Sequence, residues 1–329
     1  MKQIWKDLGI AFTMGLIVPA VLLGAVVSLK SLGKENRMIA DPDSATEPEE
    51  HLATVSSQID IAVFREDGEI VQLPLNDYLT CVVLAEMPVT FEEEALKAQS
   101  VVARTYTLRA MEKASKHEAA AVCMDASCCQ AYISTDEYLQ KGGKEENIRS
   151  IERIVTATDG RVLVYEGNLI EATYFSCSGG TTEDAVAVWG TDVPYLQSVT
   201  SPGEEGAAYY TDTVSFTAQE LASRLDLDLS GDPADWFSEA VYTDGGGIAT
   251  IMIGGETFEG TQLRKLLSLR STAFTVTTEE DTVSFHTRGY GHRVGMSQYG
   301  ANAMALDGCS YDEILLHYYQ GAELTMYAD

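Results

Sequence analysis

The stretch that decides the fold runs from residue 75 to residue 109 and reads LNDYLTCVVLAEMPVTFEEEALKAQSVVARTYTLR. Its spacing predicts two helices joined at Met87-Pro88, because proline disfavours helical geometry at the residue before it. One face of the first helix carries the positions i, i+3, i+4 and i+7: Leu79, Val82, Val83 and Glu86. Thr90 followed by Glu93 matches a capping box that would open the second helix.

Glu86 therefore ends an apolar stripe at the carboxyl end of a helix. Desolvation and the negative pole of the helix would both favour the neutral carboxyl and raise its pKa. A carboxyl that is protonated near neutral pH can act as a general acid. The alternative that these residues leave open is a carboxylate that caps a helix or pairs with a cation.

The charge of the chain argues against nucleic acid as a partner. The 329 residues include 50 acidic and 22 basic side chains, which gives a net charge of −28. Binding to nucleic-acid phosphates needs a basic surface, and the balance here is strongly acidic.

The N-terminal residues predict a membrane anchor and a single-pass location at the cell membrane. Residues 8–29 carry no charge and suffice to cross a bilayer, which takes about 20 residues. A signal peptide is the alternative, but the apolar run is longer than the usual core of one and no clean cleavage site follows. We expect an uncleaved anchor over 1–30, a flexible acidic linker over 31–57 and an extracytoplasmic catalytic domain over 58–329.

The domain from residue 58 onward predicts an α+β fold. Strand-like alternation occurs at 59–73 and a hairpin pattern at 160–177, so we expect the helix pair with Glu86 to pack against antiparallel strands. Residues 214–275 have a different pattern, with a short helix, a strand and a second helix. We expect this block to form a smaller subdomain inserted in the main one.

Soft metal ligands gather in thirteen residues with the spacing H-x5-C-x4-C-C: His117, Cys123, Cys128 and Cys129. Zinc prefers thiolate and imidazole ligands in tetrahedral sets. Four protein ligands leave no position for a catalytic water, so such a site would be structural. Disulfides are the alternative, and the spacing alone leaves both open.

A glycine-rich turn near the C-terminus reads RGYGHRVGMSQYGA over residues 288–301. It lacks the strand, turn, helix and lysine of a phosphate loop, so its glycines indicate close backbone approach to a ligand instead. Four side chains in it form hydrogen bonds and are suited to sugar hydroxyls: His292, Ser297, Gln298 and Tyr299. A tight structural turn with satisfied polar groups is the alternative.

Several motifs in order resemble the stage II sporulation protein D family: AEMP, EEALKAQ, ARTY, S-x-SGG-T, VWG and GYGHRVGMSQYGA. The resemblance implies a lytic transglycosylase of peptidoglycan. Such an enzyme cuts between N-acetylmuramic acid and N-acetylglucosamine on glycan already stripped of stem peptides. It would act during engulfment of the forespore, from the engulfing membrane of the mother cell. The implied partners are the glycan strands, the amidase stage II sporulation protein P and the scaffold stage II sporulation protein M.

The resemblance also assigns residues. The catalytic glutamate of the family's E-M-P motif falls on Glu86. The family's H-x5-C-x4-H-C zinc pattern falls on the four clustered ligands, with Cys128 in the place of a histidine. This substitution keeps a good zinc ligand, so the resemblance implies a structural zinc. A second departure is Arg293, where many relatives carry glycine; it would add a charge beside the groove.

One carboxyl is enough for this chemistry. A hydrolytic glycosidase normally needs two carboxyl groups, about 5 Å or about 6.5–9.5 Å apart, and the sequence offers one in a suitable context. In a lytic transglycosylase, Glu86 would protonate the leaving oxygen. Its carboxylate would then take the proton of the muramic C6 hydroxyl as that hydroxyl attacks C1, with the advantage of a tethered nucleophile.

Seven further residues are expected to bind the glycan: Lys97, Arg104, Ser176, Ser178, His292, Gln298 and Tyr299. Lys97 and Arg104 would meet the lactyl carboxylate that is uncovered when the stem peptide is gone; solvated helix charges are the alternative. Two rival functions stay open. One is a non-catalytic glycan-binding enhancer of a cell-wall amidase, and the other is a zinc amidase that uses the Cys/His cluster.

Overall fold

The computed structural model describes residues 58–65, 67–113 and 116–327. The expected location at the cell membrane is wrong, because no helix in these ranges is both long and apolar enough to cross a bilayer. The longest helix in these ranges, α2 (Glu93–Glu112), has 20 residues but carries six charged side chains. The predicted anchor over 1–30 and the linker over 31–57 lie outside the described residues.

The predicted helix pair is present. Helix α1 (Leu75–Glu86) ends where the sequence indicates, because Met87 before the proline is extended with φ −128°. The predicted capping box is wrong. Glu92, not Thr90, precedes α2, and no side chain caps the helix. The backbone N–H of Glu92 donates to Asn302 Oδ1 at 2.8 Å instead, so a tertiary contact replaces the local one.

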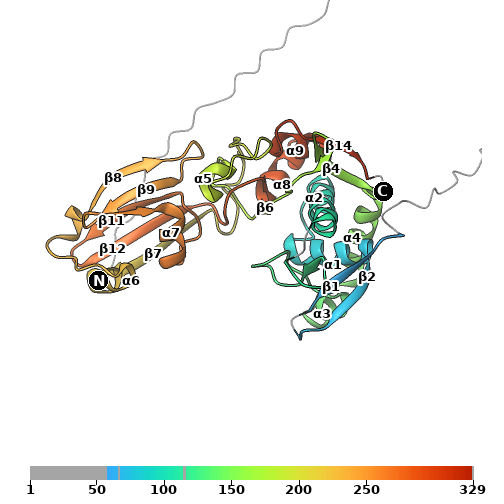
Figure 1. The fold of residues 1–329 in the computed structure, drawn as a ribbon, viewed down its shortest axis with the longest axis horizontal. Helices are drawn as coiled ribbons and strands as arrows, with labels where there is room; N and C mark the ends of the chain where they lie inside the picture. The colour runs from blue at the N-terminus through green and yellow to red at the C-terminus, as the bar shows by residue number, and fades with distance from the viewer. Residues whose placement is uncertain (1–57, 66, 114–115, 328–329) are drawn as a thin grey trace, which may run out of the picture. The chain divides into compact units, whose positions relative to one another are not determined.

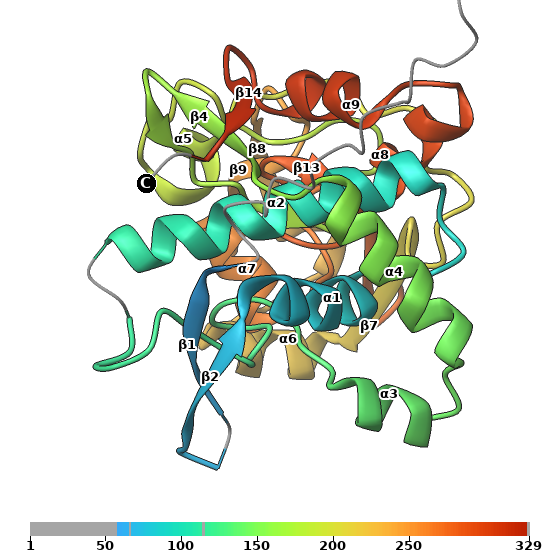
Figure 2. The ribbon, with the colours of Figure 1, turned by 90° about the vertical axis from the view of Figure 1, so that its right-hand side faces the viewer.

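Helices and small sheets share the first hydrophobic core. Figure 2 shows α2 above α1, with α4 (Glu145–Ala157) beside both. Seven of the eight residues of α2 from Ser100 to Thr107, all but Tyr106, are fully buried because other elements pack on more than one face of the helix. Strands β1 (Asp60–Phe64), β2 (Ile70–Pro74) and β3 (Val122–Cys123) form one sheet in the order β2-β1-β3.

The expected hairpin over 160–177 is only partly present. Strand β4 (Arg161–Tyr165) pairs with β5 (Asn168–Leu169), and β14 (Glu323–Met326) completes this sheet on the other side of β4. Strand β6 (Tyr174–Phe175) leaves the hairpin and pairs in parallel with β13 (Met296–Ser297). A partner far away in the sequence therefore takes the end of the predicted hairpin.

A second hydrophobic cluster extends from Phe216 to Phe285. Its strands form two antiparallel sheets: β7 (Thr211–Thr217), β12 (Thr282–Arg288) and β11 (Phe274–Glu279), and β8 (Phe237–Tyr242), β9 (Ile248–Ile253) and β10 (Glu256–Glu259). Helices α6 (Ala218–Leu225) and α7 (Gly260–Leu266) accompany them (Figure 1). The cluster runs beyond the predicted block 214–275; the inserted subdomain itself stays a prediction.

The remaining short elements are α3 (Thr135–Gln140), α5 (Ala185–Trp189), the 3₁₀ turn η2 (Pro233–Asp235), α8 (Gln298–Leu306) and α9 (Tyr311–Tyr318). Both α8 and α9 pack against α2. The α+β class is confirmed, since helices and small, mostly antiparallel sheets occur together. Pairing of β6 with β13 brings the segment before Ser178 next to the start of α8, and this junction forms one wall of the site.

Candidate active site

Glu86, the last residue of α1, lies in a pocket of about 310 Å³. The lining side chains come from α1, α2, the cysteine loop, the β6 strand and the glycine-rich turn: Glu86, Tyr106, Ala126, Cys129, Ala172, Thr173, Tyr174, Phe175, Ser176, Tyr290, Gly291, His292 and Gln298. Among these lining residues Glu86 is the only carboxyl. The pocket thus joins five segments that are far apart in the sequence around one acid.

The two oxygens of Glu86 are in different environments. Oε1 accepts hydrogen bonds from the backbone N–H of Ala131 at 2.7 Å and from the Tyr174 hydroxyl at 2.9 Å. Oε2 faces Gln298 Nε2 at 3.5 Å. Burial raises the pKa of Glu86, and these hydrogen bonds lower it by less, so the predicted direction is confirmed. A proton on the carboxyl is therefore best placed on Oε2, because Oε1 already accepts two hydrogen bonds.

Tyr174 is a site residue that the sequence reading missed. Its hydroxyl lies 2.9 Å from Glu86 and 3.3 Å from Gln130 Oε1. Burial raises the pKa of Tyr174 well above that of a free phenol, so it remains a hydrogen-bond donor at ordinary pH. No local signal marks this tyrosine, because its position depends on the pairing of β6 with β13.

His292 is held as a neutral imidazole. Its ring lies between Phe175 and Trp189, with ring centroids 5.6 Å apart in both pairs. Burial lowers the pKa of His292 to about 4, and its Nδ1 accepts a hydrogen bond from the backbone N–H of Val294 at 3.1 Å. Gly291 precedes it with φ +122°, and a Cβ there would meet the Cβ of Phe175 at 2.7 Å. The turn needs glycine at this position to bring His292 into the pocket wall.

The other predicted glycan-binding residues separate into two groups. Ser176, His292 and Gln298 line the pocket. Tyr299 does not; its ring packs edge-on against Phe91 at 5.0 Å. Ser178 is fully buried and donates its hydroxyl proton to Glu204 at 2.8 Å.

The two basic residues expected to meet a lactyl carboxylate are also engaged elsewhere. Lys97 pairs with Glu93 at 3.1 Å and with Glu94 at 2.7 Å. Arg104 is fully buried, and its guanidinium donates to the carbonyl oxygens of Thr158 at 2.8 Å and of Val155 at 3.1 Å. Helical spacing placed both on α2 but could not show that α2 is enclosed. Neither residue lines the pocket.

The sequence predicted that Arg293 adds a charge beside the groove, but this side chain is buried. It is 2% exposed, although its φ is +67°. Its guanidinium pairs with Glu183 at 2.9 Å and donates to the carbonyl oxygens of Ser178, Thr181 and Gly245, each at 2.7 Å. Because Gly245 lies in the turn between β8 and β9, Arg293 links the second hydrophobic cluster to the pocket wall.

A second buried carboxylate, Glu204, organises the wall behind Gln298. It accepts hydrogen bonds from the Ser178 hydroxyl and backbone, from the Gly179 backbone and from the hydroxyls of Ser201 and Ser297. Ser297 caps α8 through the N–H of Gly300, so the first residue of that helix, Gln298, has a fixed direction. Neither Glu183 nor Glu204 lines the pocket.

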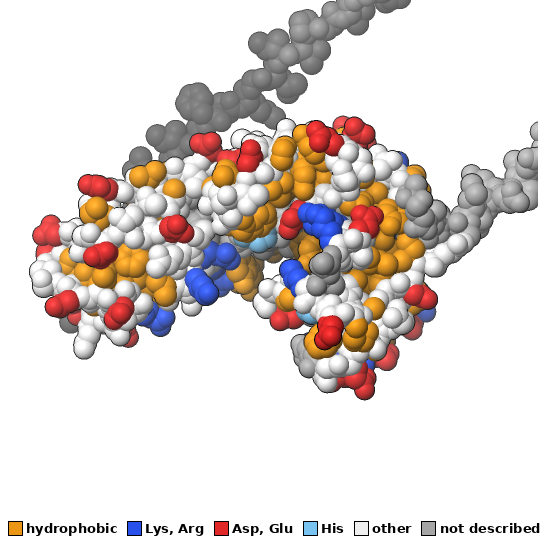
Figure 3. Space-filling model, in the orientation of Figure 1, with side chains coloured by type: hydrophobic (Ala, Val, Ile, Leu, Met, Phe, Trp, Pro, Cys, Tyr) orange, Lys and Arg blue, Asp and Glu red, His pale blue; other side chains and the backbone are white. Residues whose placement is uncertain are grey.

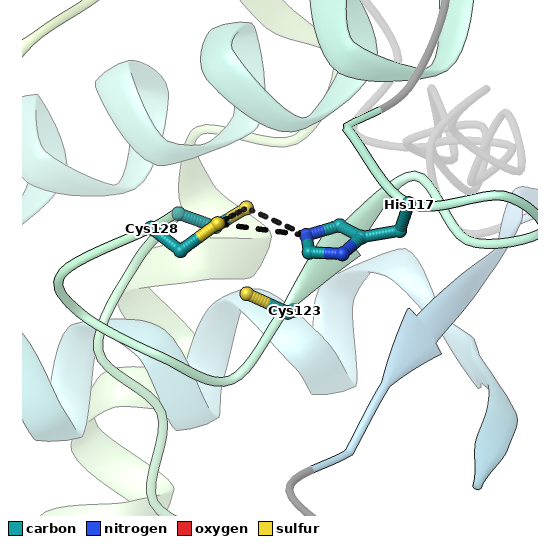
Figure 4. A group of neighbouring side chains, drawn as sticks. His117, Cys123 and Cys128 are labelled. Carbon is teal, nitrogen blue, oxygen red and sulfur yellow. Dashed lines mark hydrogen bonds between the residues drawn. The ribbon is translucent and has the colours of Figure 1, made fainter. Parts of the chain in front are cut away.

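Four side chains near the pocket could hold a metal ion: His117, Cys123, Cys128 and Cys129. Their ligand atoms all lie within 4.8 Å of one another, and Figure 4 shows His117, Cys123 and Cys128 converging. His117 Nε2 is 3.7 Å and 3.5 Å from the sulfurs of Cys128 and Cys129, which are 3.9 Å apart. All six cysteines are free thiols, so the disulfide alternative is not supported.

These distances fit zinc. Tetrahedral zinc with about 2.3 Å to sulfur and about 2.0 Å to nitrogen puts two sulfurs about 3.8 Å apart, and a sulfur and a nitrogen about 3.5 Å apart. The loop that carries the cluster also reaches the acid. Cys129 and Ala126 line the pocket, and the Ala131 N–H that binds Glu86 follows two residues after Cys129.

The fold and the site define an α+β protein with a single acid in a pocket lined by aromatic, apolar and polar side chains, beside a Cys/His cluster. A family model described as stage II sporulation protein matches residues 65–165. The chain is 37% identical to stage II sporulation protein D of Bacillus subtilis, over 99% of this chain and 96% of that protein. It is 36% identical to the protein of the same name from Bacillus amyloliquefaciens, over 94% of this chain and 92% of that one. The chain belongs to the stage II sporulation protein D family.

A further relative has a different name. The amidase enhancer of Bacillus subtilis is 29% identical over 74% of this chain and 39% of its own length. Membership of the family connects this chain with sporulation.

Proposed function

We propose that this protein is a lytic transglycosylase that cleaves N-acetylmuramic acid–N-acetylglucosamine linkages in peptidoglycan during engulfment of the forespore. The observation that carries the proposal is the state of Glu86: one carboxyl with a raised pKa, alone among the pocket-lining residues, with one oxygen engaged by two donors. A glycosidase that activates water would need a second carboxyl in this pocket.

The first step uses the proton on Oε2. Glu86 gives this proton to the glycosidic oxygen while the bond from that oxygen to C1 of the muramic residue breaks. The carboxylate that forms keeps the Ala131 N–H and the Tyr174 hydroxyl as donors to Oε1, and these stabilise its negative charge. The Gln298 amide, 3.5 Å from Oε2, can donate a hydrogen bond to the glycosidic oxygen as it becomes the hydroxyl of the departing sugar.

The second step returns the proton. The carboxylate takes the proton of the muramic C6 hydroxyl, whose oxygen forms the new bond to C1 and closes a 1,6-anhydro ring. Glu86 ends protonated, as it began, and no water is consumed. His292 takes no part in proton transfer because its pKa of about 4 leaves it neutral and without ready basicity near pH 7. We assign His292 to shaping the wall that holds Tyr174.

A zinc ion in the Cys/His cluster would have a structural role in this proposal. The donor set fits zinc, and four protein ligands complete its shell, which disfavours the zinc-amidase alternative. When bound, zinc would fix the loop from Cys123 to Ala131, whose N–H orients Glu86 Oε1. Stage II sporulation proteins P and M stay predicted partners.

The second candidate is a non-catalytic module that binds glycan and enhances a wall amidase. The name of the 29% identical Bacillus subtilis relative favours it. Both candidates place glycan in the same pocket, so binding alone does not separate them. They differ in whether Glu86 transfers a proton.

Product analysis separates the two. Purified wild-type protein and Glu86→Gln are incubated with glycan strands freed of stem peptides, and the products are identified by mass spectrometry. We expect 1,6-anhydro-muramyl ends from wild type and none from Glu86→Gln. The matched control is Glu146→Gln, which changes an exposed glutamate on α4 and should keep full activity. Wild type that binds glycan without releasing anhydro products would favour the enhancer.

A further inference from the structure

A second hollow adjoins the Glu86 pocket. This basic cleft, of about 150 Å³, is lined by residues of α2, the cysteine loop and the segment before β6: Tyr106, Arg109, Ala110, Lys113, Lys116, Ala121, Cys129 and Glu171. Tyr106 and Cys129 line the Glu86 pocket as well. The two hollows therefore share these two side chains as a common wall, so a ligand seated in one lies beside the other.

The basic cleft concentrates positive charge on a strongly acidic chain. It contains Arg109, Lys113 and Lys116 against one carboxylate, Glu171, although the whole chain has a net charge of −28. Figure 3 shows Lys and Arg side chains around the hollow of this face. Three cations around one small hollow repel one another, and an anion in the hollow would relieve that repulsion.

Much of this positive charge is not used within the described parts of the chain. Glu171 pairs with Arg109 at 3.2 Å, while Arg109 Nε is buried without a hydrogen-bond partner among these residues. Lys116 donates to the neutral carbonyl of Cys128 at 2.8 Å. The exposed side chain of Lys113 has no ion pair or hydrogen bond with any described residue. An ammonium in this position is available to a ligand.

We propose that the basic cleft binds the carboxylate of a sugar seated in the Glu86 pocket: the lactyl carboxylate of a muramic residue that carries no stem peptide. This inference rests on the proposed function. Lys113 and Lys116 supply ammonium donors, and charge-assisted hydrogen bonds of this kind are about twice as strong as neutral ones. An amide-linked stem peptide would remove that negative charge, so the cleft selects stripped glycan.

The residues that would bind the carboxylate differ from the two that the sequence predicted. Lys97 and Arg104 are occupied by glutamates and by buried carbonyl groups. The basic cleft is supplied instead by the last turn of α2 and the residues after it, and it shares Tyr106 with the Glu86 pocket. The carboxylate would therefore distinguish one end of the muramic residue from the other and orient the linkage at Glu86.

A binding experiment tests the charge directly. Full-length protein carrying Glu86→Gln, which cannot turn over, is titrated calorimetrically with stripped glycan and with the same glycan after methyl esterification of its carboxyls. The variants are Lys113→Ala and, as a control of equal charge, Lys144→Ala, an exposed lysine before α4. Thermal denaturation confirms that each variant is folded. We expect Lys113→Ala to weaken binding of the free acid about threefold, the size of an exposed ion pair.

The esterified strand completes the comparison. The esterified strand should bind more weakly than the free acid to the protein that keeps Lys113. Lys113→Ala should not lower the affinity for the esterified strand further, because the two changes remove the same interaction. Equal loss from Lys113→Ala with both strands, or no loss with either, would overturn the inference, as would an equal effect of Lys144→Ala. Wild-type anhydro products are measured in parallel. Their absence refutes the proposed function, whereas products without charge discrimination refute the cleft alone.

Discussion

Removal of the Arg293 side chain is expected to destabilise the fold strongly. Arg293→Gly removes the partner of buried Glu183 and the donor to three buried carbonyl oxygens. Breaking a buried pair on one side costs about 3–5 kcal/mol, because the other charge is left uncompensated. Relief of the left-handed backbone at φ +67° returns about 1–2 kcal/mol. The net expectation is a loss of about 1–4 kcal/mol.

The contacts of Glu183 indicate how this loss can be reversed. In the wild type, Glu183 Oε1 accepts from Arg293, from the Thr243 hydroxyl at 2.9 Å and from the Gly247 N–H at 3.0 Å. A glutamine at this position can keep the last two hydrogen bonds with its amide oxygen while it removes the buried charge. Glu183→Gln combined with Arg293→Gly should therefore be about 1–2 kcal/mol more stable than Arg293→Gly alone.

Urea unfolding of the wild type, both single variants and the double variant measures these differences, with the slope of free energy against urea checked for constancy. Glu146→Gln serves as the surface control. The reasoning about the buried pair is refuted if Arg293→Gly costs less than about 1 kcal/mol, the lower end for one buried unsatisfied group. It is also refuted if the double variant is less stable than Arg293→Gly.

Two further predictions concern the metal cluster and the acid. Chelation of the metal, or Cys123→Ser, should lower the unfolding temperature by at least about 2–4 °C, the shift for a loss of about 1 kcal/mol, because the loop around the two-residue strand β3 depends on its ligands. The control is Cys309→Ser, outside the cluster, which should respond to chelation as the wild type does. A chelator that leaves the unfolding temperature unchanged would contradict a structural zinc. Burial raises the pKa of Glu86 above its ordinary value of 4.5. Between pH 4.5 and the pKa of the folded protein, the native state therefore binds more protons than the unfolded state. The free energy of unfolding decreases as the pH rises through that window, because the proton that favours the native state is lost. The unfolding free energy of wild type minus that of Glu86→Gln should therefore fall as the pH rises, by no more than about 1.4 kcal/mol per pH unit, and a difference that is constant with pH would contradict the raised pKa.

Local features of the chain predicted much of the first core. Pro88 fixed the end of α1 through its effect on Met87, and the apolar stripe placed Glu86 where burial raises its pKa. The close spacing of the four soft ligands indicated a metal cluster, since a short loop brings such residues together in almost any fold. These features depend on neighbours within a few residues.

Other residues were misjudged because their surroundings are distant in sequence. Thr90 and Glu93 match a capping box, but Asn302 supplies the hydrogen bond at the start of α2. The helical spacing is typical of a surface charge at Arg104, but other elements enclose α2 and bury this side chain. Arg293 looked like a charge beside the groove, and its guanidinium proved to be buried among partners from three other segments.

The sequence by itself determined the helix that ends in Glu86, the spacing of the metal ligands and the family to which the chain is similar. Tertiary structure decided what surrounds the acid. Tyr174 reaches Glu86 only because β6 pairs with β13, and Lys113 shares a cleft with Cys129 and Glu171 only because the cysteine loop and the segment before β6 come together at the end of α2. The physical reason is that helix ends and short loops are set by local backbone sterics, whereas burial, and with it the protonation of a carboxyl, depends on every segment that excludes water from it.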